Sequence, residues 1–194
     1  MRKHTISRDT AETKINVTYD VDGTGEGEIK TGVGFLDHML VLFKGHGLFD
    51  LDVFCDGDIE VDYHHTTEDI GIALGQAFKV AMGDKAGITR YATVSIPMDE
   101  ALATVHLDIS GRSHLVYRVE GLKDKVGQFD TELVQEFFQG FANHAGVTLH
   151  IQVEYGTNTH HMIEAIFKAF ARALDKASSL NPRIKGIPST KGVL

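Results

Sequence analysis

Two short stretches of the sequence carry paired histidines followed by a glutamate at the same spacing. His64 stands four residues before Glu68 in "HHTTED", and His160 stands four residues before Glu164 in "HHMIEA". Both stretches lead into apolar residues at helical spacing, and positions i and i+4 of a helix share one face. One such motif is often only a helix cap or a hydrogen-bonding pair. Two copies favour a metal site.

The second histidine of each pair, His65 or His161, lies about 100° further around its helix and is expected to reach a second ion. The helix predicted before each motif adds His38, 26 residues before His64, and Glu136, 24 residues before His160. The full candidate set is His38, His64, His65, Glu68, Glu136, His160, His161 and Glu164. Imidazoles and carboxylates without thiolates suit Mn²⁺, Fe²⁺ or Zn²⁺ at two open sites. A structural zinc site would more often use cysteine.

The elements that must position these groups occur in a repeated order. Alternating apolar residues predict strands over 12–21, 48–57, 90–99, 101–110, 114–121 and 147–156, and helical spacing predicts helices over 34–47, 64–85, 130–146 and 160–177. Helix, strand, loop and paired-histidine helix recur after 96 residues. We therefore expect an α+β fold with an internal duplication into halves of about 1–95 and 96–185. Each half is predicted to be a mostly antiparallel or mixed sheet with two helices on one face.

Four residues outside these motifs are candidate phosphate ligands. Arg90 begins a predicted strand, Arg112 follows the end of another, and Ser189 and Lys191 lie in the C-terminal "IPSTKGVL". Guanidinium, ammonium and hydroxyl groups are the usual donors to a phosphate. Each residue taken alone also fits an ordinary surface position or a frayed tail.

Three carboxylates at predicted strand ends are candidate acid–base groups. Glu12 opens the first predicted strand, and Asp99 and Glu100 form a turn. A carboxylate near a reacting carbon can move a proton. Each of the three also fits a turn or a solvated position, and the sequence leaves the roles of Asp99 and Glu100 open.

Composition limits the class of partner and compartment. The 194 residues carry a formal net charge of −8, which argues against nucleic acid as the main partner but leaves room for a small phosphorylated ligand. One cysteine excludes an intrachain disulfide, and the opening residues contain no secretory hydrophobic run. There is no stretch of about 18 apolar residues. We expect a cytoplasmic protein of a single domain, with no membrane contact and no fused second activity.

The chain resembles the imidazoleglycerol-phosphate dehydratase family. The motifs run almost from end to end: "RDTAETKI", "TGVGFLDHML", "GHGLFDL", "GDIEVDYHHTTEDIGIALGQA", "RYATVSIPMDEAL", "DISGR", "HHMIEAIFKAFARAL" and "IPSTKGVL". The resemblance implies a hydro-lyase of histidine biosynthesis that converts D-erythro-imidazole glycerol phosphate to imidazole acetol phosphate and water. It also implies two Mn²⁺ ions per active site, held by the candidate set above, and a 24-subunit assembly with active sites shared between subunits. One departure is Glu136, where many family members have histidine.

The resemblance also assigns roles to residues. It places Arg90, Arg112, Ser189 and Lys191 at the phosphate, so that the tail over 186–194 contributes to the site, and it makes Glu12 the acid–base residue. The substrate-binding residues so implied are Glu12, His38, His46, His64, Glu68, Arg90, Arg112, Ser189 and Lys191.

The reaction itself explains the need for metal. The substrate loses a hydroxyl from the carbon beside its imidazole and a proton from the next carbon, which no carbonyl acidifies. We expect the charge of bound manganese to acidify the ring N–H, so that an imidazolate expels hydroxide through a diazafulvene-like intermediate. The neighbouring proton is then acidic, and the enol that forms becomes the ketone.

Two other readings use the same residues. A dinuclear metallohydrolase would use the same ligands to cleave a phosphate ester. A metal-binding or cage-forming protein would explain the paired histidines and self-association, but not the arginines together with the "PSTK" tail. Formation of a ketone without release of phosphate separates the three.

Overall fold

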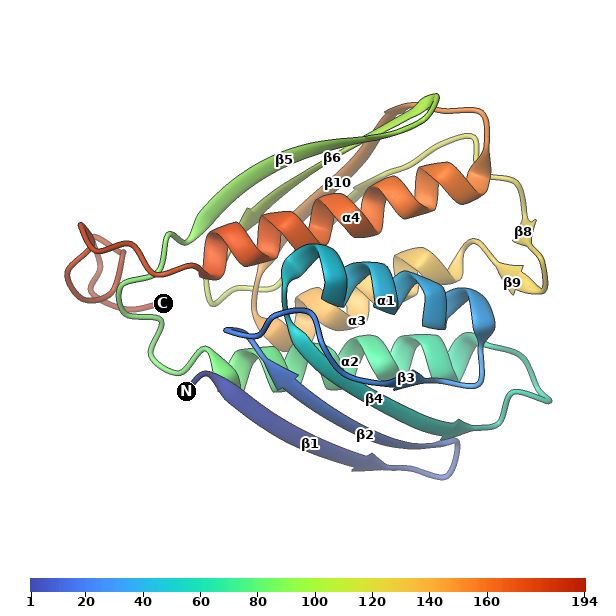
Figure 1. Ribbon diagram of the computed structural model, residues 1–194, viewed down its shortest axis with the longest axis horizontal. Coiled ribbons are helices and arrows are strands. Elements are labelled where there is room, and N and C mark those ends of the chain that lie inside the picture. Colours follow the sequence, from blue (N-terminus) through green and yellow to red (C-terminus); the bar gives the residue numbers. More distant parts are fainter.

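Two four-stranded sheets lie on either side of four helices in the computed structural model, which describes residues 1–194 (Figure 1). The first sheet contains β1 (Lys3–Asp9), β2 (Thr13–Asp20), β3 (Ile29–Lys30) and β4 (Asp50–Gly57). The second contains β5 (Tyr91–Met98), β6 (Ala101–Asp108), β7 (His114–Arg118) and β10 (Thr148–Tyr155). The helices are α1 (Gly34–Gly47), α2 (His64–Ala81), α3 (Leu133–Ala145) and α4 (Thr159–Ser178), and a small hairpin pairs β8 (Lys125–Val126) with β9 (Phe129–Asp130).

The two sheets have the same topology, which confirms the predicted internal duplication and α+β class. Their strand orders are β1-β2-β4-β3 and β5-β6-β10-β7. In each sheet the first three strands are antiparallel to their neighbours, and the last strand is parallel to the third. Both sheets are therefore mixed, as predicted. All four helices begin at the right-hand end of Figure 1, and both chain termini lie at the left.

The apolar faces of α2 and α4 hold them against the sheets. Helix α2 packs on β1 and β2, and α4 packs on β5 and β6. Along α4 the buried side chains include Ile163, Phe167, Phe170 and Leu174, at the spacing of one helical face. Burial of each such side chain stabilises the fold by roughly 1.5–3 kcal/mol. This packing fixes the start of α4, where His160 lies.

Helices from opposite halves are neighbours in the core. Helix α1 packs against α4, where Phe43 stacks on Phe170 with ring centroids 5.4 Å apart. Helix α2 packs so closely on α3 that a Cβ added at Gly71 would lie 2.4 Å from the carbonyl oxygen of Phe137. One continuous core of 46 buried residues results, so the two halves fold as one body.

The element boundaries differ from the sequence prediction in a few places. Strand β1 was not predicted, because none of its residues is buried and its alternation is of polar side chains. Strands β3, β8 and β9 have two residues each, which is too short for a periodic pattern. Helix α2 ends at Ala81 rather than at residue 85, ahead of Gly83 and Lys85, both of which have positive φ. None of the helices combines the length and the apolarity that crossing a membrane requires.

Candidate active site

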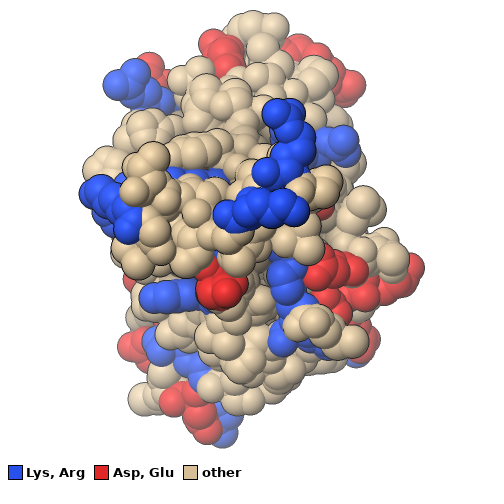
Figure 2. Space-filling view, turned by 90° about the vertical axis from the view of Figure 1, so that its left-hand side faces the viewer, with Lys and Arg blue, Asp and Glu red and all other residues tan.

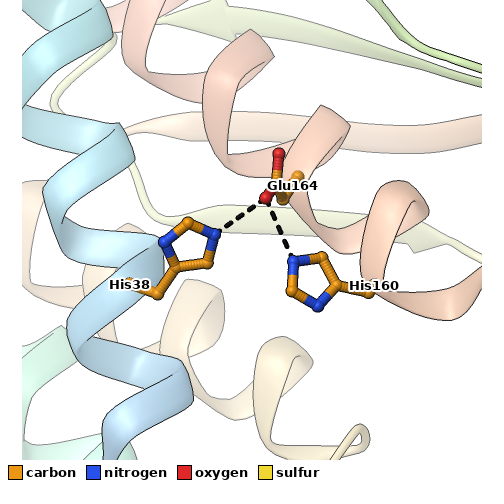
Figure 3. Close-up of side chains that lie close together, drawn as sticks. All are labelled: His38, His160 and Glu164. Atoms are coloured by element: carbon orange, nitrogen blue, oxygen red, sulfur yellow. Dashed lines mark hydrogen bonds and ion pairs between the residues drawn. The ribbon is translucent and has the colours of Figure 1, made fainter.

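Three predicted metal ligands converge at the packed pair α1 and α4. His38 comes from α1, and His160 and Glu164 come from the first turns of α4 (Figure 3). The Nε2 atoms of His38 and His160 lie 2.8 and 3.0 Å from the same carboxylate oxygen, Oε1 of Glu164. One ligand atom from each residue lies within 4.8 Å of the other two. This arrangement can hold a divalent cation and leaves positions for further ligands.

Glu164 is buried but ionised. Its side chain is 9% exposed, and Nζ of Lys168 donates a hydrogen bond to Oε2 at 2.5 Å. Burial alone would raise the pKa of Glu164, but hydrogen bonds from Lys168, His38 and His160 lower it to about 2. Lys168 thus holds one carboxylate oxygen and leaves the other facing the two imidazoles. Lys168 was not singled out from the sequence, although its position four residues after Glu164 is the same helical signal.

The equivalent group at the start of α2 is more open. Nε2 of His64 lies 3.6 Å from Oε2 of Glu68, and both side chains are more than two-fifths exposed. Glu136 makes no hydrogen bond or ion pair within the chain and is half-buried. It does precede Phe137, whose backbone contacts α2 at Gly71, three residues after Glu68. The chain therefore brings His64 to Glu68 and places Glu136 on the adjoining helix, without joining all three.

The two rings of each histidine pair are nearly perpendicular, with centroids 6.1 Å apart for His64 and His65 and 6.3 Å apart for His160 and His161. The ring planes of His64 and His65 are inclined by 85°, and those of His160 and His161 also by 85°. Nδ1 of His65 lies 2.9 Å from a carboxylate oxygen of Asp58, and Nδ1 of His161 lies 2.8 Å from one of Glu100. These hydrogen bonds raise the pKa of both imidazoles.

The turn before β2 presents Glu12 to His65. Oε1 of Glu12 lies 3.6 Å from Nε2 of His65, and half of the Glu12 side chain is exposed. The adjacent Thr13 hydroxyl donates to the buried carboxylate of Asp69 at 2.5 Å, and Arg8 donates to the same carboxylate at 2.8 Å. Asp69 therefore anchors this turn.

Glu100 occupies the corresponding turn in the second half. Glu12 directly precedes β2, and Glu100 directly precedes β6, the equivalent strand. Unlike Glu12, Glu100 is tightly held: hydrogen bonds from the His161 ring and from the backbone N–H groups of Asn158 and Thr157 lower its pKa to about 2. The neighbouring Asp99 lies 3.9 Å from Nε2 of His161.

His46 lies on α1 two turns after His38. It is half-buried, and burial, followed by the charges of Lys168 and Arg172, lowers its pKa. A neutral imidazole with one free acceptor nitrogen is the form that this environment favours.

Arg90 connects the second sheet to the C-terminal tail. Its guanidinium donates to Asp108 on β6 at 2.7 Å and to the carbonyl oxygen of Pro188 at 2.7 Å. Its backbone N–H donates to the carbonyl oxygen of Ala177, near the end of α4, at 2.7 Å. Arg90 thus lies at the opposite end of α4 from His160.

The other predicted phosphate ligands are at the same end. Arg112 follows Gly111, whose backbone lies against the terminal residue Leu194. Ser189 and Lys191 are in the tail, where Oγ of Ser189 accepts a hydrogen bond from the backbone of Lys191 at 3.2 Å. Figure 2 looks onto this end of the molecule and shows Lys and Arg side chains in both its upper and its lower half.

The metal group and the cations are far apart within one chain. His160 and Ala177 are 17 residues apart on α4, which at 1.5 Å per residue is about 25 Å. The structure therefore does not bring the predicted phosphate ligands to the predicted metal ligands of the same chain.

Comparisons with known proteins agree in sequence and in fold. The family model described as Imidazoleglycerol-phosphate dehydratase matches residues 31–174. A relative of that name from Oceanobacillus iheyensis is 61% identical, and one from Pelobacter propionicus is 60% identical; the matches cover 100% of this chain and 100% and 99% of the relatives. The crystal structure of the enzyme of that name from Staphylococcus aureus has a TM-score of 0.85 at 46% identity and covers 92% of this chain and 99% of its own. The crystal structure of IGPD from Pyrococcus furiosus in complex with (S)-C348 has a TM-score of 0.84 at 38% identity and covers 97% and 100%.

Proposed function

Since the chain belongs to the imidazoleglycerol-phosphate dehydratase family, we propose that its two histidine–glutamate groups hold the metal ions used in that reaction. The chain is a hydro-lyase of histidine biosynthesis, which removes water from imidazole glycerol phosphate and leaves imidazole acetol phosphate. The observation that carries the proposal is the convergence of His38 and His160 on Glu164.

We propose two manganese ions per active site, as the family resemblance implies. Imidazole nitrogens and ionised carboxylates without a thiolate are compatible with Mn²⁺, as they are with Fe²⁺ or Zn²⁺. The ligands we propose are His38, His64, His65, Glu68, Glu136, His160, His161 and Glu164. When bound, the ions supply positive charge that makes the N–H of a substrate imidazole more acidic. His65 and His161 lie about 100° around their helices from the first histidines of their pairs and bond to other carboxylates through Nδ1, so each could serve a different ion.

Glu12 is the residue that we propose to move the proton. The substrate loses hydroxide from the carbon beside the ring, and a base must take the proton from the next carbon; together they make water. Glu12 is half exposed and approaches His65 without being bound by backbone donors. Its counterpart Glu100 is held by donors from three residues, Thr157, Asn158 and His161, and has no such freedom. The neutral His46 would lie beside the same substrate and can accept a hydrogen bond.

The phosphate group would bind to Arg90, Arg112, Ser189 and Lys191, with the tail over 186–194 closing the site. Bond lengths make the substrate about 10 Å long. The separation of about 25 Å along α4 is much larger, so the cations of one chain serve the metal group of another. This supports intersubunit active sites in the proposed 24-subunit assembly. Fixing the phosphate at one end orients the ring at the other.

Metal reconstitution tests the proposed function. Chelation of the protein should abolish ketone formation from imidazole glycerol phosphate, and Mn²⁺ should restore it without release of inorganic phosphate. Release of phosphate would favour a metallohydrolase. Full turnover by the chelated protein would refute the metal role.

Glu12→Gln tests the proton transfer separately. The amide keeps the size of the side chain but cannot accept the proton, so kcat should fall about 10²–10⁴-fold while substrate binding is retained. Unchanged turnover would exclude Glu12 as the base. Sizing with and without chelator tests the assembly, because ions shared between chains should stabilise the large particle. A particle of unchanged size and melting temperature would contradict metal-linked assembly.

A further inference from the structure

We propose that Asp58 and Glu100 are positioning residues that orient His65 and His161 and leave their Nε2 atoms free to bind metal. The inference rests on the proposed metal function and concerns residues that do not contact the ion. Its basis is the pair of carboxylate–imidazole hydrogen bonds, one at the start of α2 and one at the start of α4.

The identity of the bonded atoms fixes the ring state. Oδ2 of Asp58 lies 2.9 Å from Nδ1 of His65, and Oε2 of Glu100 lies 2.8 Å from Nδ1 of His161. A carboxylate can only accept, so Nδ1 carries the hydrogen in both rings. In a neutral imidazole the lone pair is then on Nε2. Both rings thus present the same atom for coordination and are held from behind by an anion, which raises ligand basicity.

The two carboxylates come from different places in the duplicated fold. Asp58 lies between β4 and α2, seven residues before His65. Glu100 lies in the turn between β5 and β6, 61 residues before His161. The position equivalent to Glu100 in the first half is Glu12, which bonds to no ring Nδ1. The duplication alone therefore does not explain the shared arrangement. It is explained if both histidines need a carboxylate acceptor at Nδ1 to orient the ring.

The surrounding contacts distinguish the two carboxylates from ordinary helix caps. Asp62 is the cap-like acid at α2, because it accepts from the backbone N–H of His64 at 2.7 Å and makes no hydrogen bond or ion pair with an imidazole. Asn158 has that role at α4, where its side chain accepts from the backbone of His161. Glu100 also accepts from the backbone N–H groups of Thr157 and Asn158, but through Oε1, so its Oε2 is left for the ring of His161, as Oδ2 of Asp58 is for the ring of His65.

Metal affinity measured by calorimetry on the intact, chelated and re-dialysed protein tests the inference. Asp58→Ala and Glu100→Ala remove the acceptor, and each should weaken Mn²⁺ binding about 10–100-fold at one of the two ions. Asp58→Asn and Glu100→Gln keep a neutral acceptor and should lose less affinity for Mn²⁺ than the alanine variants. Asp62→Ala is the matched control from the same loop and should retain wild-type affinity, since it removes only a backbone contact.

Each outcome separates this inference from the proposed function. If the wild-type protein binds no Mn²⁺, the proposed function itself fails. If it binds Mn²⁺ and the alanine variants bind equally tightly, only the positioning role fails. An equal loss in Asp62→Ala would assign the effect to disorder of the loop and would also overturn the inference. If an alanine variant fails to fold, the amide variant at the same position, Asp58→Asn or Glu100→Gln, decides. An affinity for Mn²⁺ below that of the wild type supports the inference, and wild-type affinity contradicts it.

Discussion

Replacement of Gly71 with alanine should force α2 and α3 apart. The added Cβ would lie 2.4 Å from the carbonyl oxygen of Phe137, whereas ordinary contacts begin at 3.4 Å, so the helices must separate by about 1 Å. The carbonyl is helix backbone and the Cβ is bonded directly to helix backbone, so neither can rotate away. We therefore place the cost near the top of the range for overpacking, about 3 kcal/mol, and the better helix propensity of alanine returns about 1 kcal/mol. The expected net loss is about 2 kcal/mol.

The same displacement should act mainly on the metal group that joins α2 to α3. His64 and Glu68 are on α2 and Glu136 is on α3, so their separation would grow, whereas His38, His160 and Glu164 lie on the other helix pair. A shift of about 1 Å can lower activity about 100-fold. Urea unfolding of the metal-free chain measures the free energy of unfolding, and calorimetric titration with Mn²⁺ measures the affinity for each ion.

The matched control for this prediction is Gly45→Ala in α1. An added Cβ there meets no atom within 4 Å, so the variant should gain up to about 1 kcal/mol from helix propensity and keep both ions. If Gly71→Ala unfolds at the same urea concentration as Gly45→Ala, the proposed close contact between α2 and α3 does not control stability. If Gly71→Ala weakens the binding of both ions equally, the two metal groups are not structurally separate.

Two further predictions concern groups away from the metal ligands. Asp69→Ala leaves the Arg8 guanidinium and the Thr13 hydroxyl without their acceptor and should cost about 2–3 kcal/mol in urea unfolding, less than a fully buried pair because a third of the Arg8 side chain is exposed. Asp69→Asn should lose less, and equal, negligible losses in both variants would refute the anchoring role. Burial raises the pKa of the Cys55 thiol to about 11. At pH 8 its thiolate fraction is then about 0.1% against roughly a quarter for an exposed cysteine, so iodoacetamide should alkylate the folded chain about 200-fold more slowly than the urea-unfolded chain. Rates within tenfold of each other would contradict this.

Local geometry explains which parts of the site could be predicted from the sequence. The pairing of His160 with Glu164 depends only on the helical repeat, and the structure confirms that it brings their ligand atoms together. The duplication could also be predicted, because the same order of helices and strands recurs along the sequence. The reaction was predicted from the resemblance of the motifs to those of the family.

Tertiary contacts explain what the sequence did not reveal. His38 was a candidate, but its partner motif could not be assigned, because α1 of the first half packs on α4 of the second. Asp58 carries no local signal, and the role of Glu100 emerges only when the β5–β6 turn reaches the start of α4. The separation of the cations from the metal group likewise depends on where the C-terminal tail folds back onto Arg90.

Mixed assemblies test most directly the central claim that one active site combines the metal group of one chain with the cations of another. One variant, His160→Ala, lacks a metal ligand; the other, Arg112→Ala with Lys191→Ala, lacks two phosphate ligands. Each alone should be inactive. When the two are co-assembled in equal amounts, random pairing should restore roughly a quarter of the wild-type sites, because a site built from two chains can draw both intact groups. Activity of the mixture no higher than that of the separate variants would contradict the shared site.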